Sequence, residues 1–317
     1  MKLARIGLVL LALICVGLTL LNASWLTPKP GGPLIVLAHR GTVQPTEGAA
    51  GDDCPARHVR ELASNYIENT LYSMHGAIAY GARGFALDVQ ASADGKAVIF
   101  RDATLDCRTD GHGRVDALPL AELKRIDVGF GYSADGGETF PLRGRGIGGM
   151  PTAAEVLRAF PSAPILFELA DARAAQALVA AFAEANVPIG EQHGFAGPPQ
   201  ARARLRQLTQ NGWLLDPEAS EGCLAGYRST GWLGQVPESC RGVTLILPRS
   251  GGFSLWGWPY RFLDRMKSGG ARFLIGKDAQ SEQLAGLDQA EQLGEVPHDY
   301  RGLLLIEDMY FVGRALQ

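Results

Sequence analysis

The stretch LIVLAHRG, residues 34–41, joins an apolar run to polar groups and sets the pattern for the rest of the chain. Its first five residues are rich in branched side chains, which is typical of a buried strand. Similar runs recur at 84–90, 97–100, 165–169, 193–196, 213–215, 243–247, 272–275 and 303–306. Helix-like stretches separate most of them, at 69–80, 152–160, 172–185, 199–210 and 260–267. Apolar strands separated by helices indicate a parallel sheet covered on its outer face.

This alternation predicts an α/β fold, a (β/α)8 TIM barrel over residues 34–317. The chain has nine strand candidates where a closed barrel needs eight, and we expect the superfluous one among the last three. An open doubly wound sheet is the alternative, but no G-x-G-x-x-G follows the first strand, which disfavours a dinucleotide fold. Residues 42–66 are interpreted as a long loop, and residues about 128–150 as an insertion. Loops that follow barrel strands build the active site, so both are expected to cover a pocket.

The first 27 residues are predicted to form a signal anchor, and residues 28–33 a linker. Lys2 and Arg5 precede an apolar run at 6–21, and Trp25 follows it, which is the charge order of an export signal. The positive end should stay in the cytoplasm and place the barrel on the periplasmic or extracytoplasmic side. We favour an uncleaved, single-pass membrane anchor. The alternative is a cleaved signal peptide and a secreted protein.

Charge and cysteine content limit the possible partners. The formal net charge of −3 gives no sign of nucleic-acid binding. Apart from Cys15 in the anchor, four cysteines remain, and proximity in sequence favours the pair Cys223–Cys240, which leaves Cys54–Cys107 as the second pair. Four unpaired thiols are the alternative. None of the cysteines has metal-type spacing, so zinc is not expected.

Polar residues stand where several of the predicted strands end. His39 and Arg40 end the first strand, and Glu68 and Asn69 open the following helix. The other members are Asp88, Arg101, Asp102 and Glu168. Such a set suits phosphate ester chemistry. Oxygen ligands hold Mg²⁺ or Ca²⁺, arginine binds phosphate in a bidentate manner, and an imidazole carries a proton.

The stretch from residue 38 to about 169 resembles the glycerophosphodiester phosphodiesterase family. The matching motifs are A-H-R-G at 38–41, E-N-T-L at 68–71, G-A-x-G-x-x-L-D-V at 81–89, D-G-K-A-V-I-F-x-D at 94–102, T-L-D-x-R-T-D-G at 104–111, M-P-T at 150–152 and F-E-L at 167–169. The resemblance implies a TIM barrel that uses a divalent metal, Ca²⁺ or Mg²⁺, to cleave glycerophosphodiesters into glycerol 3-phosphate and an alcohol.

The resemblance also implies roles for individual residues. His39 would be one of two acid/base histidines, Arg40 a phosphate clamp, and Glu68 an active-site carboxylate. Asp88 and Glu168 would be metal ligands. Asn69 would support the site by hydrogen bonding at the substrate phosphate.

Three positions depart from the family pattern. Ala86 stands where the family has a glutamate, Arg101 where it has a second histidine, and Ala170 where it has a lysine. Residues two apart on a strand share a face, so Ala86 removes a carboxylate from the side that presents Asp88. Arg101 cannot carry a proton as histidine does, but it can bind phosphate.

Three functions are therefore compared. We favour a phosphoric diester hydrolase that acts on a glycerophosphodiester or a lysolipid. A degenerate relative that binds phosphodiesters or lipid head groups without turnover is the alternative, and an accessory envelope protein with a remnant site is a third.

His112 is considered as a substitute imidazole, although an exposed loop histidine is favoured. The aromatic residues Trp256, Trp258 and Tyr260 either line a lipid pocket, approach the membrane interface, or simply pack.

Overall fold

The structure of the protein is a computed structural model that describes residues 2–46, 54–60, 62, 64–249, 252–277 and 284–316. The chain divides into two compact units. The larger unit comprises residues 35–215, 285–293 and 305–317, and the smaller comprises residues 1–34, 216–284 and 294–304.

Five strands of the larger unit pair in parallel, in the order β1, β2, β4, β5 and β6. Their bounds are Ile35–His39, Gly84–Ala91, Ile165–Leu169, His193–Ala196 and Trp213–Leu214. A sixth strand, β3 (Ala97–Ile99), pairs antiparallel with β2. β3 follows β2 through a tight turn at Gly95, where φ is +74°, and a turn of this length joins antiparallel strands only.

The ninth strand candidate is therefore β3, and the expectation that it lay among the last three was wrong. Those three are β7 (Thr244–Leu247), β8 (Arg272–Ile275) and β9 (Leu303–Ile306), and β7 pairs in parallel with β8 and β8 with β9. The parallel strands follow the order β6-β5-β4-β2-β1-β9-β8-β7, which is the cyclic order of a TIM barrel. The predicted fold class is confirmed.

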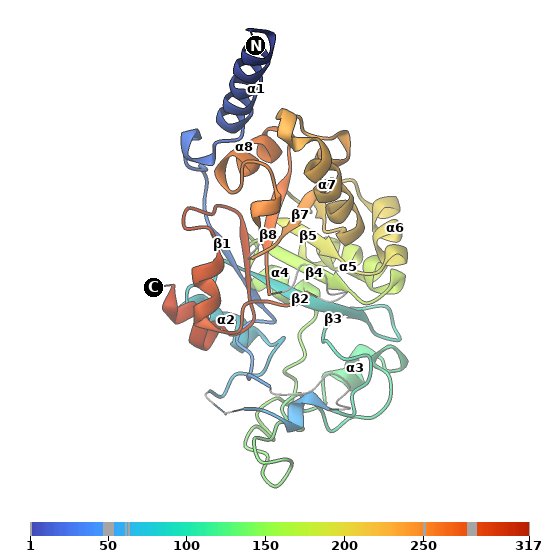
Figure 1. Cartoon of the computed structure of the whole chain (residues 1–317). Helices are drawn as coiled ribbons and strands as arrows, with labels where there is room; N and C mark the ends of the chain where they lie inside the picture. Colours follow the sequence, from blue (N-terminus) through green and yellow to red (C-terminus); the bar gives the residue numbers. More distant parts are fainter. Residues whose placement is uncertain are drawn as a thin grey trace. The chain divides into compact units, whose positions relative to one another are not determined.

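Helices follow the first six barrel strands. Their bounds are α2 Leu71–Ala79, α4 Ala153–Ala159, α5 Ala172–Ala185, α6 Pro199–Leu208, α7 Pro217–Thr230 and α8 Tyr260–Ser268, and the short α3 spans Leu120–Leu123. In the larger unit α4, α5 and α6 lie side by side against the sheet (Figure 1). After β8 and β9 the chain forms short segments instead, 3₁₀ at Ala290–Glu295 and π at Met309–Gly313.

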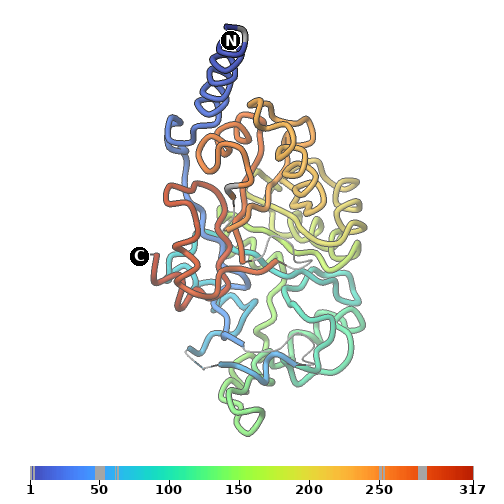
Figure 2. Tube along the Cα trace, in the orientation of Figure 1, coloured from blue at the N-terminus to red at the C-terminus, as the bar shows by residue number. Residues whose placement is uncertain are grey.

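The long loops of the larger unit pack into a cluster of their own. Residues 128–150, all of which the structure describes, contain no helix or strand, and Val128, Tyr132, Leu142 and Met150 are buried against Ala56 and Val59. The backbone of Ser133 bonds to Ala56 and Val59, so the two loops lie side by side (Figure 2). The Cys54–Cys107 disulfide fastens the same region, as predicted.

The smaller unit begins with α1 (Lys2–Leu21), whose apolar stretch 4–21 contains no buried residue and is long enough to cross a membrane. This feature fits a membrane anchor or a signal peptide. The short helix η1 (Ser24–Leu26) follows it. The second predicted disulfide, Cys223–Cys240, joins α7 to the 3₁₀ turn Glu238–Cys240.

Candidate active site

Three predicted site residues meet at the ends of neighbouring strands of the larger unit. His39 ends β1, and Asp88 of β2 stands opposite Glu168 of β4 in the parallel register. One ligand atom from each of the three lies within 4.8 Å of the other two. The barrel register thus brings together groups that are 129 residues apart along the chain.

The imidazole of His39 is only 4% exposed and lies between two carboxylates. Its Nε2 is 2.9 Å from Glu168 Oε1, and its Nδ1 is 2.6 Å from Glu307 Oε2. A carboxylate accepts hydrogen bonds and donates none when ionised, so both bonds form together only when both ring nitrogens carry protons. Glu307 therefore holds the ring through Nδ1, and Nε2 is the nitrogen that lies next to Glu168.

Glu307 is a site residue that the sequence reasoning missed. It directly follows β9, at the same end of the barrel strands as His39, and it also forms an ion pair with the guanidinium of Arg40. The feature of the sequence that could have identified Glu307 is its position directly after the last apolar run. Nothing in the motifs of the first half of the chain pointed to it.

A second group of charges surrounds Glu68. Arg40 Nη1 is 3.1 Å from Glu68 Oε1, and Arg108 Nη1 is 3.4 Å from Glu68 Oε2. Arg108 is 2% exposed, donates to Asp102 at 2.8 Å and donates to the hydroxyl of Tyr132 at 3.1 Å. The Glu68 carboxylate is thus held between two guanidinium groups.

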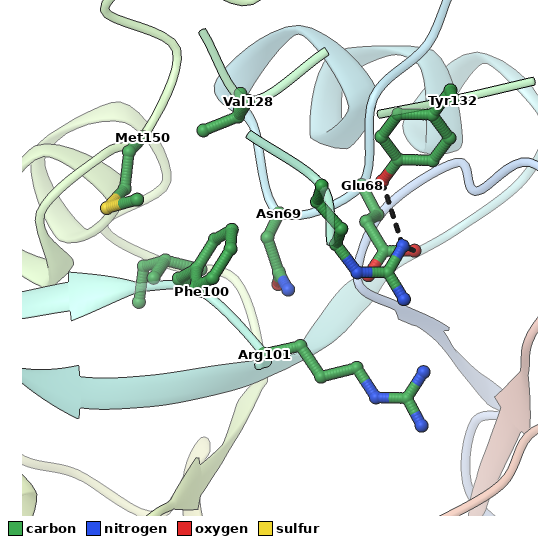
Figure 3. Close-up of a pocket in the computed structure, with 9 residues that line it drawn as sticks. Glu68, Asn69, Phe100, Arg101, Val128, Tyr132 and Met150 are labelled. Atoms are coloured by element: carbon green, nitrogen blue, oxygen red, sulfur yellow. Dashed lines mark hydrogen bonds and ion pairs between the residues drawn. The ribbon is translucent and has the colours of Figure 1, made fainter. Parts of the chain in front are cut away.

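Glu68, Asn69, Arg101 and Tyr132 line a small cavity together with the apolar side chains of Phe100, Val128 and Met150 (Figure 3). The polar side chains lie on one side of the cavity and the apolar ones on the other. Arg108 and Tyr132 were not predicted as site residues, although Arg108 lies within the motif at 104–111. The insertion contributes to the site through Tyr132.

The arginines govern the ionisation of this region. Burial would raise the pKa of Glu68, but Arg108 and then Arg40 outweigh it and lower the pKa to about 2. Arg40 lowers the pKa of Arg101 by repulsion, and burial lowers it further. Burial raises the pKa of Tyr132, and the negative charge of Glu68 adds to the rise. Glu68 therefore stays ionised and Tyr132 stays neutral at neutral pH.

The backbone that presents Arg40 and Asn69 is unusual. Their φ angles are +63° and +59°, in the left-handed region that residues other than glycine seldom adopt. The amide of Asn69 donates to the carbonyl oxygen of Arg40 at 2.8 Å, so the two strained residues support each other. Gly41 is needed at the next position, because its φ is +82° and a Cβ there would lie 2.4 Å from Ser73 Oγ. Strain of this kind is concentrated at functional sites.

The other predicted residues take different positions. Asn69 Nδ2 donates to Asp88 Oδ2 at 2.9 Å. Asp102 accepts a hydrogen bond from Arg108 Nε at 2.8 Å. His112 is exposed and pairs with Asp106 at 3.1 Å, so it supplies no imidazole here. Ala86 is fully buried on β2, two residues from Asp88.

The donors present fit a divalent cation. Asp88 and Glu168 offer hard oxygen ligands beside His39, and the buried side-chain oxygen of Asn69 makes no hydrogen bond among the residues that the structure describes. An unpartnered buried oxygen of this kind next to Asp88 suits a hard cation. The site is therefore a possible metal site of His, Asp and Glu.

Glu68→Gln is expected to weaken the dependence of the free energy of unfolding on pH in the acid range. The ordinary pKa of 4.5 falls to about 2 in the folded protein, so the stability that this carboxylate contributes is complete above pH 4.5 and is lost as the pH falls toward 2. The loss for the unaltered protein should be on the order of 3 kcal/mol. Urea unfolding of the full chain in detergent, repeated from pH 5 to about 2, measures it. Parallel curves for both proteins would contradict the prediction.

Comparison with known proteins points to one family. The glycerophosphoryl diester phosphodiesterase family matches residues 60–185. The uncharacterized protein Rv2277c of Mycobacterium tuberculosis is 32% identical over 120 residues, which are 38% of this chain and 40% of that protein. A glycerophosphodiester phosphodiesterase of Caldanaerobacter subterraneus is 38% identical over 80 residues, which are 25% of this chain and 33% of that protein. This chain spans about half the length, or less, of the curated relatives that it matches.

Solved structures share the fold over nearly the whole chain. The glycerophosphoryl diester phosphodiesterase domain of Rv2277c has a TM-score of 0.62 at 17% identity, and the match covers 90% of this chain and 99% of that domain. A phosphodiesterase of Oleispira antarctica, solved in complex with the product sn-glycerol-3-phosphate, has a TM-score of 0.53 at 18% identity. The match covers 93% of this chain and 99% of that chain. Both matches support the TIM barrel. In sequence the chain is similar to the glycerophosphodiester phosphodiesterase family over residues 60–185, the family that its motifs resemble.

Proposed function

We propose that this protein hydrolyses a phosphodiester bond of a glycerophosphodiester or lysolipid, and that it releases a phosphomonoester and an alcohol. The observation that carries the proposal is the position of His39. Its ring is buried, held at Nδ1 by Glu307, in contact with Glu168 through Nε2, and grouped with Asp88 and Glu168. A fixed imidazole can transfer a proton, and a metal site and an arginine beside it can stabilise the charge of a phosphate.

Each residue of the site would have a separate role in the reaction. His39 Nε2 gives and takes the proton, and Glu307 keeps the ring oriented. Arg40 presents positive charge to the phosphate, while Glu68 holds both Arg40 and Arg108 in place. When bound, a divalent cation would neutralise phosphoryl oxygens. We propose Asp88 and Glu168 as its ligands and Ca²⁺ or Mg²⁺ as its identity, because the carboxylates are hard ligands.

Binding without turnover is the second candidate, and three substitutions favour it. Ala86 offers no carboxylate next to Asp88, Arg101 stands where the family has a second histidine, and Ala170 replaces a lysine. Loss of one positioned acid or base typically lowers the rate by ~10²–10⁴. Arg101 and Arg40 could still bind a phosphate in such a protein.

The proposed location is the cell membrane, with the barrel on the extracytoplasmic side. Lys2 and Arg5 precede the exposed apolar helix α1, which is the order expected when the N-terminus stays in the cytoplasm. Removal of α1 as a signal peptide is the alternative. Mass measurement of the protein from a membrane fraction separates the two.

One assay tests the hydrolase. The full chain in detergent is incubated with glycerophosphocholine and glycerophosphoethanolamine, with chelator and then with Ca²⁺ or Mg²⁺, while released alcohol and glycerol 3-phosphate are measured. We expect release that requires the metal. Substrate binding by calorimetry with no release would favour the binding protein instead, and neither binding nor release would remove both candidates.

A further inference from the structure

The smaller unit presents exposed apolar side chains around the end of α1. Trp25 is 74% exposed, Trp232 is 37% exposed and Trp256 is 43% exposed, and Leu26 and Leu233 beside them are also exposed. We name these five residues the collar. They come from three segments, namely η1, η4 (Gly231–Leu233) and the loop before α8.

The collar and the end of α1 are tied together by Arg265 of α8. This buried guanidinium donates to Leu21 O at 2.9 Å, to Asn22 Oδ1 at 3.0 Å and to Gly231 O at 3.1 Å. It thereby satisfies a carbonyl group that the end of a helix leaves free. Asn22 Nδ2 also donates to Trp232 O at 2.9 Å. The helix end and η4 are therefore held in one arrangement.

Trp256 and Trp25 are connected to the same framework. Tyr227 accepts from Arg265 at 2.8 Å and donates to Trp256 O at 2.9 Å. The indole of Trp256 donates to Arg228 O at 2.9 Å, and the Ser24 hydroxyl beside Trp25 accepts from Tyr260 N at 2.9 Å. Trp258, by contrast, is half-buried and packs on Phe262, with ring centroids 5.6 Å apart.

We propose that the collar lies in the lipid headgroup region of the membrane that α1 enters, so that the smaller unit rests on the bilayer through Trp232, Leu233 and Trp256 as well as through the anchor. The inference rests on the proposed anchoring by α1 and not on the hydrolase activity. Tryptophan is enriched at the membrane interface, where an apolar ring and a polar N–H are both satisfied. Exposed apolar groups clustered at the exit of an apolar helix fit that environment better than water.

The test uses the full chain in phosphatidylcholine vesicles whose acyl chains are brominated near the headgroups. Bromine quenches the emission of tryptophans that touch it. The unaltered protein is compared with W232F/W256F and with the matched control W213F, which removes a tryptophan of β6 that is not in the collar. We expect W232F/W256F to lose more than half of the quenched emission and W213F to lose none.

Each outcome separates the collar from the anchor. A third variant, W25F, removes the tryptophan next to α1. If W25F lowers the quenched emission but W232F/W256F does not, only the segment that follows α1 touches lipid, and the proposal that the smaller unit rests on the bilayer through Trp232 and Trp256 is overturned. If no variant changes it, α1 does not enter the bilayer, and the collar proposal fails together with the anchor. Concentration-dependent crosslinking between chains, with unquenched Trp232 and Trp256, would assign the collar to a second copy instead. Thermal melts of each variant confirm that it is folded.

Discussion

His39→Ala should lower the turnover number by ~10²–10⁴, with little change in substrate affinity. His39 is the imidazole that the structure places at the site, because His112 is exposed on a loop and pairs with Asp106. Two other ionisable groups of the site, Glu68 and Tyr132, are poor proton carriers at neutral pH. Glu68 has a pKa of about 2, and burial raises the pKa of Tyr132. Arg40 stays in place in this variant, so phosphate binding should persist.

We expect kcat to fall in His39→Ala while KM stays nearly unchanged. Both constants come from the rate of alcohol release measured against substrate concentration. His112→Ala is the matched control and should behave as the unaltered protein. In His39→Ala, Glu168 and Glu307 face the space left by the imidazole. Water can enter that space, since the two side chains are 17% and 20% exposed. A thermal melt checks that the fold survives. Equal turnover of His39→Ala and the unaltered protein would place the chemistry elsewhere.

Glu307 can be examined in the same assay. It contacts His39 through Nδ1 and is not one of the three residues of the possible metal site, His39, Asp88 and Glu168. Because Glu307 also pairs with Arg40, its removal should affect substrate affinity as well as turnover. That pattern differs from the one expected for His39 and distinguishes a positioning group from a proton carrier.

Much of the fold could be predicted because the strands are short, apolar and separated by helices. All nine strand candidates are strands, and the helix expected at 172–185 has the bounds of α5. The role of the run at 97–100 could not be predicted, since a short apolar run has the same pattern in a hairpin and in a barrel. The turn at Gly95 settles it, and turn geometry is a weaker signal than periodicity.

The site was predictable where its residues lie in the contiguous motifs of the first half of the chain. His39, Asp88 and Glu168 meet because parallel strands place their ends at one edge. Glu307 could not be found in this way, because it lies 268 residues from His39 and carries no motif. Arg108 was visible in a motif, but its partner Tyr132 comes from the insertion, whose course no periodic pattern describes.

Restoring two family residues together, Ala86→Glu with Arg101→His, should raise the turnover number by roughly 10² or more and make it depend more strongly on Ca²⁺ or Mg²⁺. Ala86 is fully buried and pairs in register with His39 and Leu166. A glutamate there would share the face of β2 with Asp88 and add a hard ligand to Asp88 and Glu168. The histidine would supply the second proton carrier that a guanidinium cannot be.

Stability gives this prediction a readout that does not depend on turnover. A buried carboxylate without a counter-ion is costly, so Ala86→Glu should melt at a lower temperature in chelator and recover when Ca²⁺ or Mg²⁺ is added. Ala86→Gln has the same shape without the charge and should show no such recovery. If the metal stabilises neither variant, the face of β2 that carries Asp88 does not hold a cation. Metal-dependent recovery without a gain in turnover would mean instead that proton transfer, and not the missing ligand, limits the rate in this chain.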